Sequence, residues 1–348
     1  MLGFLRTSWA LMVVVGHLFW VGDFGRFAVF GFYILSGFLM TTIMHQSYGY
    51  SLKGLRKFSI NRFLRLFPTY WLVCIIAIVI IFYAPVFESN KFGGLGMPES
   101  ISAIFGNATL IYPNWIPSRV GPRLSPATWA LTVELFYYLL IALGISRTYR
   151  TTVIWVVFSL CFVLLTYAFG FYWHSRYFSI PAGSLPFSLG ALIFFMTRTE
   201  ITNKTLKALT ERPLFLFFLM LSISAFASYL VSISYDYWFV EVLFYLSMIV
   251  SFLLVLSLAR GKVLIKSISR ELDSKIGHFS YPVYLLHYQA AALASLILYG
   301  DMVLLKRMEE FSLTLVILSL IFLFLLSYLT INLVDNRVEK LRLRVKKL

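Results

Sequence analysis

Long apolar runs separated by short polar segments fill the sequence from one end to the other. A helix of about 20 apolar residues crosses the hydrocarbon core of a bilayer. Runs of roughly this length occur at residues 4–22, 27–45, 66–84, 126–144, 151–170, 180–196, 214–232, 236–258, 277–299 and 311–333. The pattern predicts an all-α polytopic membrane protein with about ten transmembrane helices.

Composition strengthens this prediction. The 348 residues are 60% hydrophobic and 13% charged, whereas soluble domains carry about 25% charged residues. We expect a single transmembrane domain over residues 1–348, with no appended soluble domain. The sequence has no nucleic-acid-binding module and no metal-ligand spacing of His or Cys, so neither nucleic acid nor a metal ion is expected as a partner.

The distribution of basic residues predicts the orientation of the helices. The net charge is +15, and 23 of the 30 Lys and Arg residues fall at the chain ends or in alternate loops on one side. Basic loops stay in the cytoplasm, so both termini are predicted to be cytoplasmic. The basic C-terminal tail is most simply explained as an anchor on anionic membrane lipid.

Two polar side chains interrupt the first apolar run. Arg6 and His17 are eleven residues apart, which on a helix places them within roughly 20° of one face and about 16 Å apart along the axis. Charged or titratable residues inside a membrane usually face a polar cavity rather than lipid. We therefore expect this helix to line a reaction chamber.

Further polar groups lie in or beside other apolar runs. Glu134 lies near the middle of the fourth run and could pair with Arg6, hydrogen-bond His17 or form a purely structural pair. Glu241 is a second buried carboxylate for which the sequence suggests no partner. His287, in the ninth run, fits a structural role and a role at a donor site equally well.

The segment before the third run carries a pair of arginines. Arg62 and Arg65 share a helix face at the predicted cytoplasmic boundary, and Pro68 is expected to disturb the first turn of the following helix. Paired arginines suit phosphate recognition, but they also suit simple anchoring by the positive-inside rule. The long loop between Ala84 and Ser125 is expected to be either a functional lid or an ordered surface loop.

Five segments, in order, resemble the motifs of membrane-bound acyltransferase family 3. Arg6 and His17 match its Arg-x10-His pair, and further segments match its F-x-x-L-S-G-F-L, R-R-F-x-R-I-x-P-x-Y-W, W-S-L-x-V-E-x-x-F-Y and G-x-x-S-Y-x-x-Y-L-x-H patterns. These segments are residues 32–39, 61–71, 125–137 and 277–287. The resemblance covers nearly the whole chain and implies a multi-pass enzyme of the bacterial inner membrane that O-acylates cell-surface polysaccharides.

The resemblance suggests roles for ten residues. Acyl-CoA, most often acetyl-CoA, is the expected donor substrate, a saccharide or lipid-linked glycan is the expected acceptor, and no bound cofactor is expected. The hypothesis assigns catalysis to His17, Arg6 and Glu134, donor binding to Arg62, Arg65, His287 and Tyr281, and acceptor binding or cavity lining to Ser36, Trp129 and Tyr137. Neutral His17 would be the general base on the acceptor hydroxyl, and Arg6 would steady the donor or the developing oxyanion.

Two other functions fit the same buried polar residues. A transporter or flippase of lipid-linked glycans could use them, although the inverted repeats common in transporters are absent from the sequence. A non-catalytic scaffold for polysaccharide-assembly proteins would need Arg6 and His17 only as pairing groups between helices. Separate assembly proteins are possible partners under either the enzyme or the scaffold hypothesis.

Overall fold

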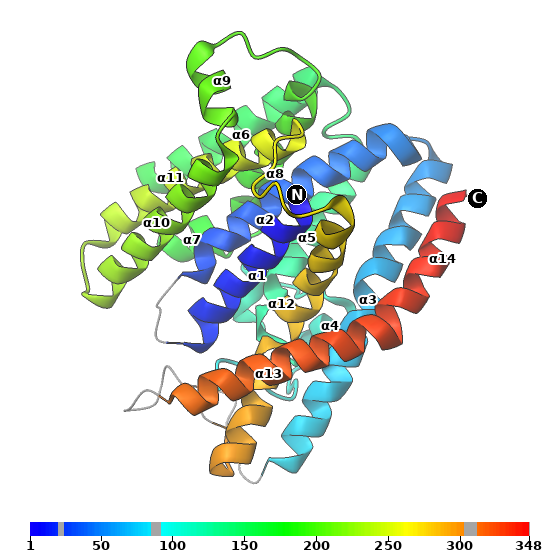
Figure 1. Ribbon diagram of the computed structural model, residues 1–348, viewed down its shortest axis with the longest axis vertical. Helices are drawn as coiled ribbons and strands as arrows, with labels where there is room; N and C mark the ends of the chain where they lie inside the picture. Colours follow the sequence, from blue (N-terminus) through cyan, green and yellow to red (C-terminus); the bar gives the residue numbers. More distant parts are fainter. Residues whose placement is uncertain (20–23, 85–91, 303–311, 348) are drawn as a thin grey trace.

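The computed structural model describes residues 1–19, 24–84, 92–302 and 312–347, and it shows a bundle of long helices (Figure 1). The helices are α1 (Leu2–Leu18), α2 (Gly25–Ile43), α3 (Leu52–Tyr83), α4 (Ile101–Thr109), α5 (Trp129–Ala142), α6 (Tyr149–Ala168), α7 (Trp173–Tyr177), α8 (Ser184–Met196), α9 (Lys204–Thr210), α10 (Pro213–Ser232), α11 (Tyr237–Ala259), α12 (Arg270–Tyr299), α13 (Leu313–Thr330) and α14 (Asn336–Lys347).

Each of the ten apolar runs corresponds to a helix. Among the described residues, seven helices are long and apolar enough to cross a membrane, and the shorter apolar helices Leu2–Leu18, Pro126–Ala142 and Pro181–Met196 account for the first, fourth and sixth runs. The predicted all-α polytopic membrane fold is therefore confirmed.

The start of the third helix was predicted wrongly. Helix α3 begins at Leu52 rather than Leu66, so Arg62 and Arg65 lie within it. Pro68 also lies inside α3 and does not end it, although proline removes a backbone hydrogen bond. Close to this point the hydroxyl of Tyr281 donates to the carbonyl of Leu66 over 3.0 Å, which joins α12 to α3.

Helices α1 and α12 run parallel with a nearly constant offset in sequence. Asp273 accepts hydrogen bonds from the backbone amides of Gly3 and Phe4, and His17 contacts His287 at the other end of α1. At both ends of α1, the contacts with α12 therefore join residues about 270 positions apart in the sequence. A Cβ on Gly3 would lie 2.0 Å from the carbonyl oxygen of Asp273, so the close approach requires glycine there.

The small residues of the second apolar run serve both helix packing and a polar contact. A Cβ on Gly37 would lie 2.2 Å from the carbonyl oxygen of Phe187, so α2 and α8 are packed closely at this point. The neighbouring Ser36 instead donates a hydrogen bond to Glu134 of α5.

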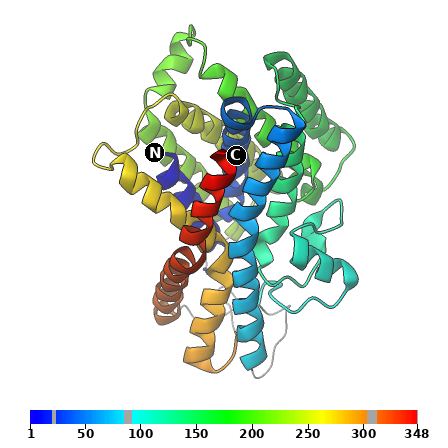
Figure 2. The ribbon, with the colours of Figure 1, turned by 90° about the vertical axis from the view of Figure 1, so that its right-hand side faces the viewer.

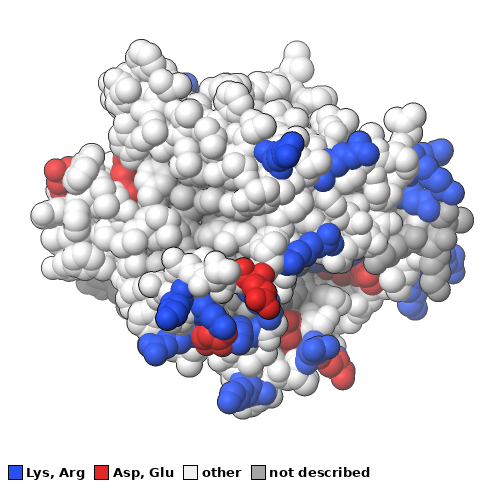
Figure 3. All heavy atoms as spheres, turned by 90° about the horizontal axis from the view of Figure 1, so that it is seen from above, with Lys and Arg blue, Asp and Glu red and all other residues white. Residues whose placement is uncertain are grey.

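Both termini lie toward the same end of the molecule (Figures 1 and 2), as an even number of membrane crossings requires. Viewed onto that end, Lys and Arg side chains gather at several places, with fewer Asp and Glu side chains among them (Figure 3). The assignment of this end to the cytoplasm stays a prediction from the loop charges.

Candidate functional site

Many polar residues of the described chain line one or the other of two cavities. The first, which we call the Arg6 cavity, has a volume of about 500 Å³ and is lined by residues of α1, α2, α3, α5, α12 and α14. Its polar lining comprises Arg6, Ser36, Arg62, Arg65, Glu134, Tyr138, Asp273, His278, Tyr281, Tyr284, Glu339 and Arg342, among others. It therefore brings together side chains from almost the whole length of the sequence.

The carboxylates of the Arg6 cavity are already engaged with other groups. One oxygen of Glu134 accepts hydrogen bonds from Ser36, at 2.5 Å, and from the hydroxyl of Tyr138. Asp273 binds the first amides of α1, and Glu339 pairs with Arg342. Glu134 thus completes a polar wall beside Arg6, and its hydrogen bonds do not go to His17, contrary to one expected role.

Three arginines of this cavity have no acidic partner within the described chain. No carboxylate of the described residues lies within salt-bridge distance of Arg6, Arg62 or Arg65. Arg62 donates to Asn61 over 3.0 Å and lies near the sulfur of Met40, while its Nε has no hydrogen-bond partner. Guanidinium groups held together in this way can bind a polyanion with several phosphates.

The second cavity, the His17 cavity, has a volume of about 550 Å³. It lies at the other end of α1 and is lined by residues from the long loop, the start of α5, α7 and α12. The lining consists of His17, Gly93, Ser118, Arg119, Arg123, Pro126, Trp129, Tyr172, His174, Ser175, Phe178 and Tyr288. Aromatic rings beside hydrogen-bonding groups suit a ligand with both apolar faces and hydroxyls.

The long loop therefore contributes directly to a cavity. Arg123 donates to the carbonyls of Pro126 at 2.9 Å and Ser118 at 3.0 Å, and also to Val120, which fixes the curve of the loop. Burial lowers the pKa of the Arg123 guanidinium from its usual value. The contacts to backbone carbonyls replace part of the hydration that burial removes from this charge.

His17, which lines the His17 cavity, contacts a second and fully buried histidine, His287. Nδ1 of His17 lies 3.0 Å from Nε2 of His287, and the ring planes differ by 23°. Nδ1 of His287 lies 2.8 Å from the carbonyl oxygen of Tyr284. A carbonyl can only accept a hydrogen bond, so a neutral His287 carries its proton on Nδ1 and accepts at Nε2.

These two contacts favour one tautomer of a neutral His17. If His287 accepts at Nε2, then a neutral His17 must donate from Nδ1, and its lone pair is on Nε2. A histidine held as one tautomer by a neighbour is suited to act as a general base. His287 contacts His17 and does not line the Arg6 cavity, and its role in donor binding stays a prediction.

The two cavities are close neighbours at the start of α5. Trp129 lines the His17 cavity, whereas the next residue, Ala130, lines the Arg6 cavity. The hydroxyls of Tyr33 and Tyr284 donate to the carbonyls of Ala130 and Ala127, at 3.2 and 2.7 Å. The boundary between the cavities thus consists of two tyrosines and the first turns of α5.

Of the predicted residues not yet placed, two line the Arg6 cavity and one lines neither cavity. Ser36 and Tyr281 line the Arg6 cavity. Tyr137 lines neither cavity, because its hydroxyl donates to the carbonyl of Ile180 and its ring stacks on Phe187. Its placement is that of a packing residue between α5 and α8.

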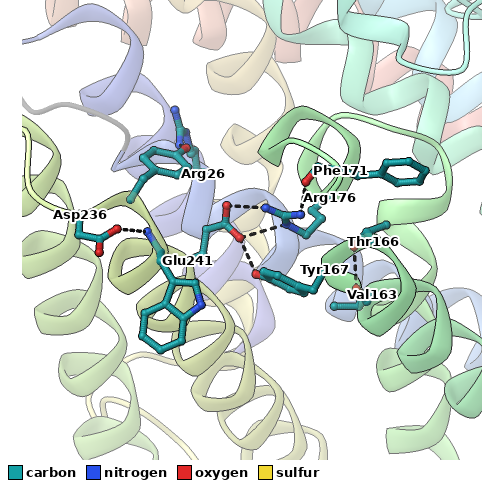
Figure 4. Close-up of polar contacts among 10 residues, drawn as sticks. Arg26, Val163, Thr166, Tyr167, Phe171, Arg176, Asp236 and Glu241 are labelled. Atoms are coloured by element: carbon teal, nitrogen blue, oxygen red, sulfur yellow. Dashed lines mark hydrogen bonds and ion pairs between the residues drawn. The ribbon is translucent and has the colours of Figure 1, made fainter. Parts of the chain in front are cut away.

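The carboxylate without a predicted partner forms a buried ion pair. Glu241 of α11 accepts hydrogen bonds from Arg176 of α7 at 3.0 and 2.9 Å, and from Tyr167 at 2.5 Å (Figure 4). The two charged side chains are 5% and 8% exposed. Because Tyr172 and His174 border α7 or belong to it and line the His17 cavity, this ion pair fixes part of the cavity wall.

Comparison with known proteins identifies the family of the chain. A family model described as an acyltransferase domain, that of the acyltransferase 3 family, matches residues 2–335. The chain belongs to the acyltransferase 3 family. No curated protein and no solved structure matches it. The five motifs therefore indicated the family of this acyltransferase correctly. Both cavities lie almost entirely within the matched region.

Sequence reasoning missed two arginines of this acyltransferase that the structure makes important. The sequence suggests no role for Arg176, although a membrane carboxylate such as Glu241 requires a cationic or hydrogen-bonding partner. Arg342 was read as part of a lipid-binding tail, yet it lines the Arg6 cavity. No spacing in the sequence connects residue 342 with residue 62, so only the fold could reveal that contact.

Proposed function

We propose that this acyltransferase transfers an acyl group, most simply acetyl, from cytosolic acyl-CoA to a hydroxyl of a cell-surface or lipid-linked saccharide. The observation that carries the proposal is the His17–His287 pair, which presents a base with a defined tautomer at one wall of a cavity. The bacterial inner membrane is the proposed location, and separate polysaccharide-assembly proteins are possible partners.

The Arg6 cavity supports the donor half of the proposal. Acyl-CoA carries several phosphates at its nucleotide end, and Arg6, Arg62 and Arg65 supply cations without acidic partners among the described residues. Eleven residues of helix separate Arg6 from His17, a rise of about 16 Å. The flexible arm of CoA would cover this distance and bring the thioester toward His17.

This separation changes the role that suits Arg6. Arg6 and His17 line different cavities, so a guanidinium at Arg6 is too distant to stabilise an oxyanion formed beside His17. Arg6 is better suited to bind the donor. Glu134 is better suited to complete the polar wall of the cavity beside Arg6. The proton transfer then depends on His17, with His287 as the residue that positions it.

The His17 cavity supports the acceptor half. Trp129, Tyr172 and Tyr288 provide aromatic surfaces against which a sugar ring can pack, and Arg119 and His174 provide hydrogen-bond donors at the same cavity. A saccharide hydroxyl placed near His17 would lie on the opposite side of the Tyr33 and Tyr284 boundary from the donor phosphates.

The proposed reaction is one acyl transfer with a balanced proton path. Nε2 of His17 takes the proton of the acceptor hydroxyl while the oxygen attacks the thioester carbonyl carbon. The tetrahedral intermediate collapses, the C–S bond breaks, and CoA leaves as a thiolate that takes the proton from His17. Positioned base catalysis typically supplies about 10²–10⁴-fold, and holding both substrates in place supplies much of the remainder.

The proposal is tested by measuring acyl transfer with purified protein in lipid vesicles. The substrates are labelled acetyl-CoA and a glycan extract from the cells in which the protein occurs, and the products are identified by mass spectrometry. We expect His17→Ala to reduce product formation by about 10²–10⁴-fold. His45→Ala is the matched control, because His45 lines neither cavity and contacts the carbonyl of Ser146. Movement of glycan across the vesicles without acylation would establish a transporter instead, and full activity of His17→Ala would overturn the proposed base.

A further inference from the structure

The C-terminal helix is not a free tail. Helix α14 follows a five-residue π-helical segment, Ile331–Asp335, and packs along α3 (Figure 2). The family match ends at residue 335, so α14 lies wholly outside the matched region. It nevertheless contributes Glu339 and Arg342 to the lining of the Arg6 cavity.

Arg342 is held in place by side chains from both helices. Its Nε and Nη2 donate to Oδ1 of Asn61 at 3.3 and 3.2 Å, and Nη1 donates to Glu339. The amide of Asn61 in turn donates to the carbonyl of Arg342 at 3.4 Å. The side chain of Arg342 is only 15% exposed, compared with 42% for Glu339.

The same asparagine joins Arg342 to the cavity arginines. Oδ1 of Asn61 also accepts a hydrogen bond from Nη2 of Arg62 at 3.0 Å. One neutral oxygen therefore holds two guanidinium groups at the cavity wall. A guanidinium has five N–H donors, and three bonds to Asn61 and Glu339 leave two of those of Arg342 for a ligand.

The charges of this wall are only partly balanced. Arg6, Arg62, Arg65 and Arg342 line one cavity, and Glu339 is the one carboxylate in the described chain that forms an ion pair with any of them. Like charges confined in a partly buried site repel one another. A ligand with several negative charges would remove that repulsion.

We propose that α14 is part of the donor-binding site and that Arg342 binds a phosphate at the nucleotide end of acyl-CoA. This inference rests on the proposed function for the identity of the donor. It gives the C-terminal helix a role in substrate binding that its basic composition alone does not indicate. The remaining basic residues of α14, such as Arg337 and Arg344, are exposed and stay available to lipid headgroups.

The experiment compares arginines on the same helix. We expect Arg342→Ala to raise the KM for acetyl-CoA about 10–100-fold, the effect of losing charge-assisted hydrogen bonds, with little change in kcat. Arg344→Ala and Arg337→Ala remove the same charge from exposed positions and should leave this KM unchanged. Equal effects of all three variants would instead indicate membrane anchoring and would overturn the proposal.

A truncated donor separates phosphate binding from structural damage. S-acetylpantetheine lacks the nucleotide and its phosphates, so wild type and Arg342→Ala should use it equally well. Arg342→Lys keeps a charge and should show an intermediate KM for acetyl-CoA. A variant equally impaired with both donors would show a structural role and would contradict the assignment.

A measurement of CoA binding tests this inference separately from the proposed function. Calorimetric titration of the detergent-purified chain with CoA measures the site without catalysis. Wild type that binds CoA in an Arg342-dependent manner but transfers no acyl group would refute the proposed function and support the site. Active wild type whose affinity for CoA is unchanged by Arg342→Ala would refute the site alone.

Discussion

Nδ1 of His17 and Nε2 of His287 lie 3.0 Å apart although 270 residues separate them in the chain. Because the other nitrogen of His287 faces the carbonyl of Tyr284, this contact defines which nitrogen of His17 can accept a proton. The pair links the predicted base to a residue on a different helix, and it is the basis of the first prediction.

His287→Leu removes the acceptor for Nδ1–H of His17, whereas His287→Gln keeps an oxygen that can accept this bond. We expect the leucine variant to lose most of the about 10²–10⁴-fold that a positioned base supplies, and the glutamine variant to keep a larger share. His17 can accept a proton only when it is neutral, so the pH profile of the transfer rate is a readout that a purely structural role of His287 would not change. A leucine variant with wild-type rate and pH profile would contradict the positioning role.

Gly277→Ala should disturb the pair from the opposite end of α1. A Cβ at residue 277 would lie 2.7 Å from the Cα of Gly3, so α1 must move away from α12. We expect lower activity and a lower unfolding temperature, measured by transfer assay and thermal denaturation in detergent. Ser8→Ala is the control on α1, because Ser8 makes no side-chain hydrogen bond in the described structure and a smaller side chain introduces no clash.

Glu134→Ala should destabilise the wall of the Arg6 cavity. The change leaves the hydroxyls of Ser36 and Tyr138 without their acceptor, and unsatisfied buried groups cost about 1–3 kcal/mol each. Glu134→Gln keeps one acceptor oxygen and should cost less. Chemical denaturation of both variants measures the difference, and equal stability of the two would show that the hydrogen bonds matter little.

The buried ion pair of Arg176 and Glu241 gives a fourth prediction. Removing one partner of such a pair leaves an uncompensated buried charge and typically costs about 3–5 kcal/mol. We expect Glu241→Ala to lower the unfolding temperature strongly, and the double variant Arg176→Met with Glu241→Leu to recover much of the loss. If the double variant is as unstable as the single one, the pairing is not the source of the stability.

The helices could be predicted from the sequence because each has a strong local signal. Ten apolar runs of spanning length correspond to ten apolar helices, and the five motifs identified the family that the comparison confirms. The start of α3 was missed because the polar residues from Lys53 to Arg65 look like a loop by hydropathy, yet they continue the helix beyond the apolar run.

The candidate site was less predictable because its contacts join distant segments. Burial and charge marked Arg6, His17 and Glu134 as functional, but they could not show that Glu134 belongs with Arg6 and that His287 belongs with His17. Tyr137 fits a family motif and was expected at a cavity, yet it packs against Phe187. Partners of this kind depend on how helices are arranged, which periodicity alone does not specify.

The parallel contact of α1 with α12 has a consequence for biosynthesis. The first helix to emerge from the ribosome carries Arg6 and His17, but Asp273 and His287 follow about 270 residues later. During most of translation α1 therefore lacks the helix that binds its first turn and its histidine. The proposed base acquires its partner only when nearly the whole chain has been synthesised, so incomplete chains contain His17 without the arrangement that would make it active.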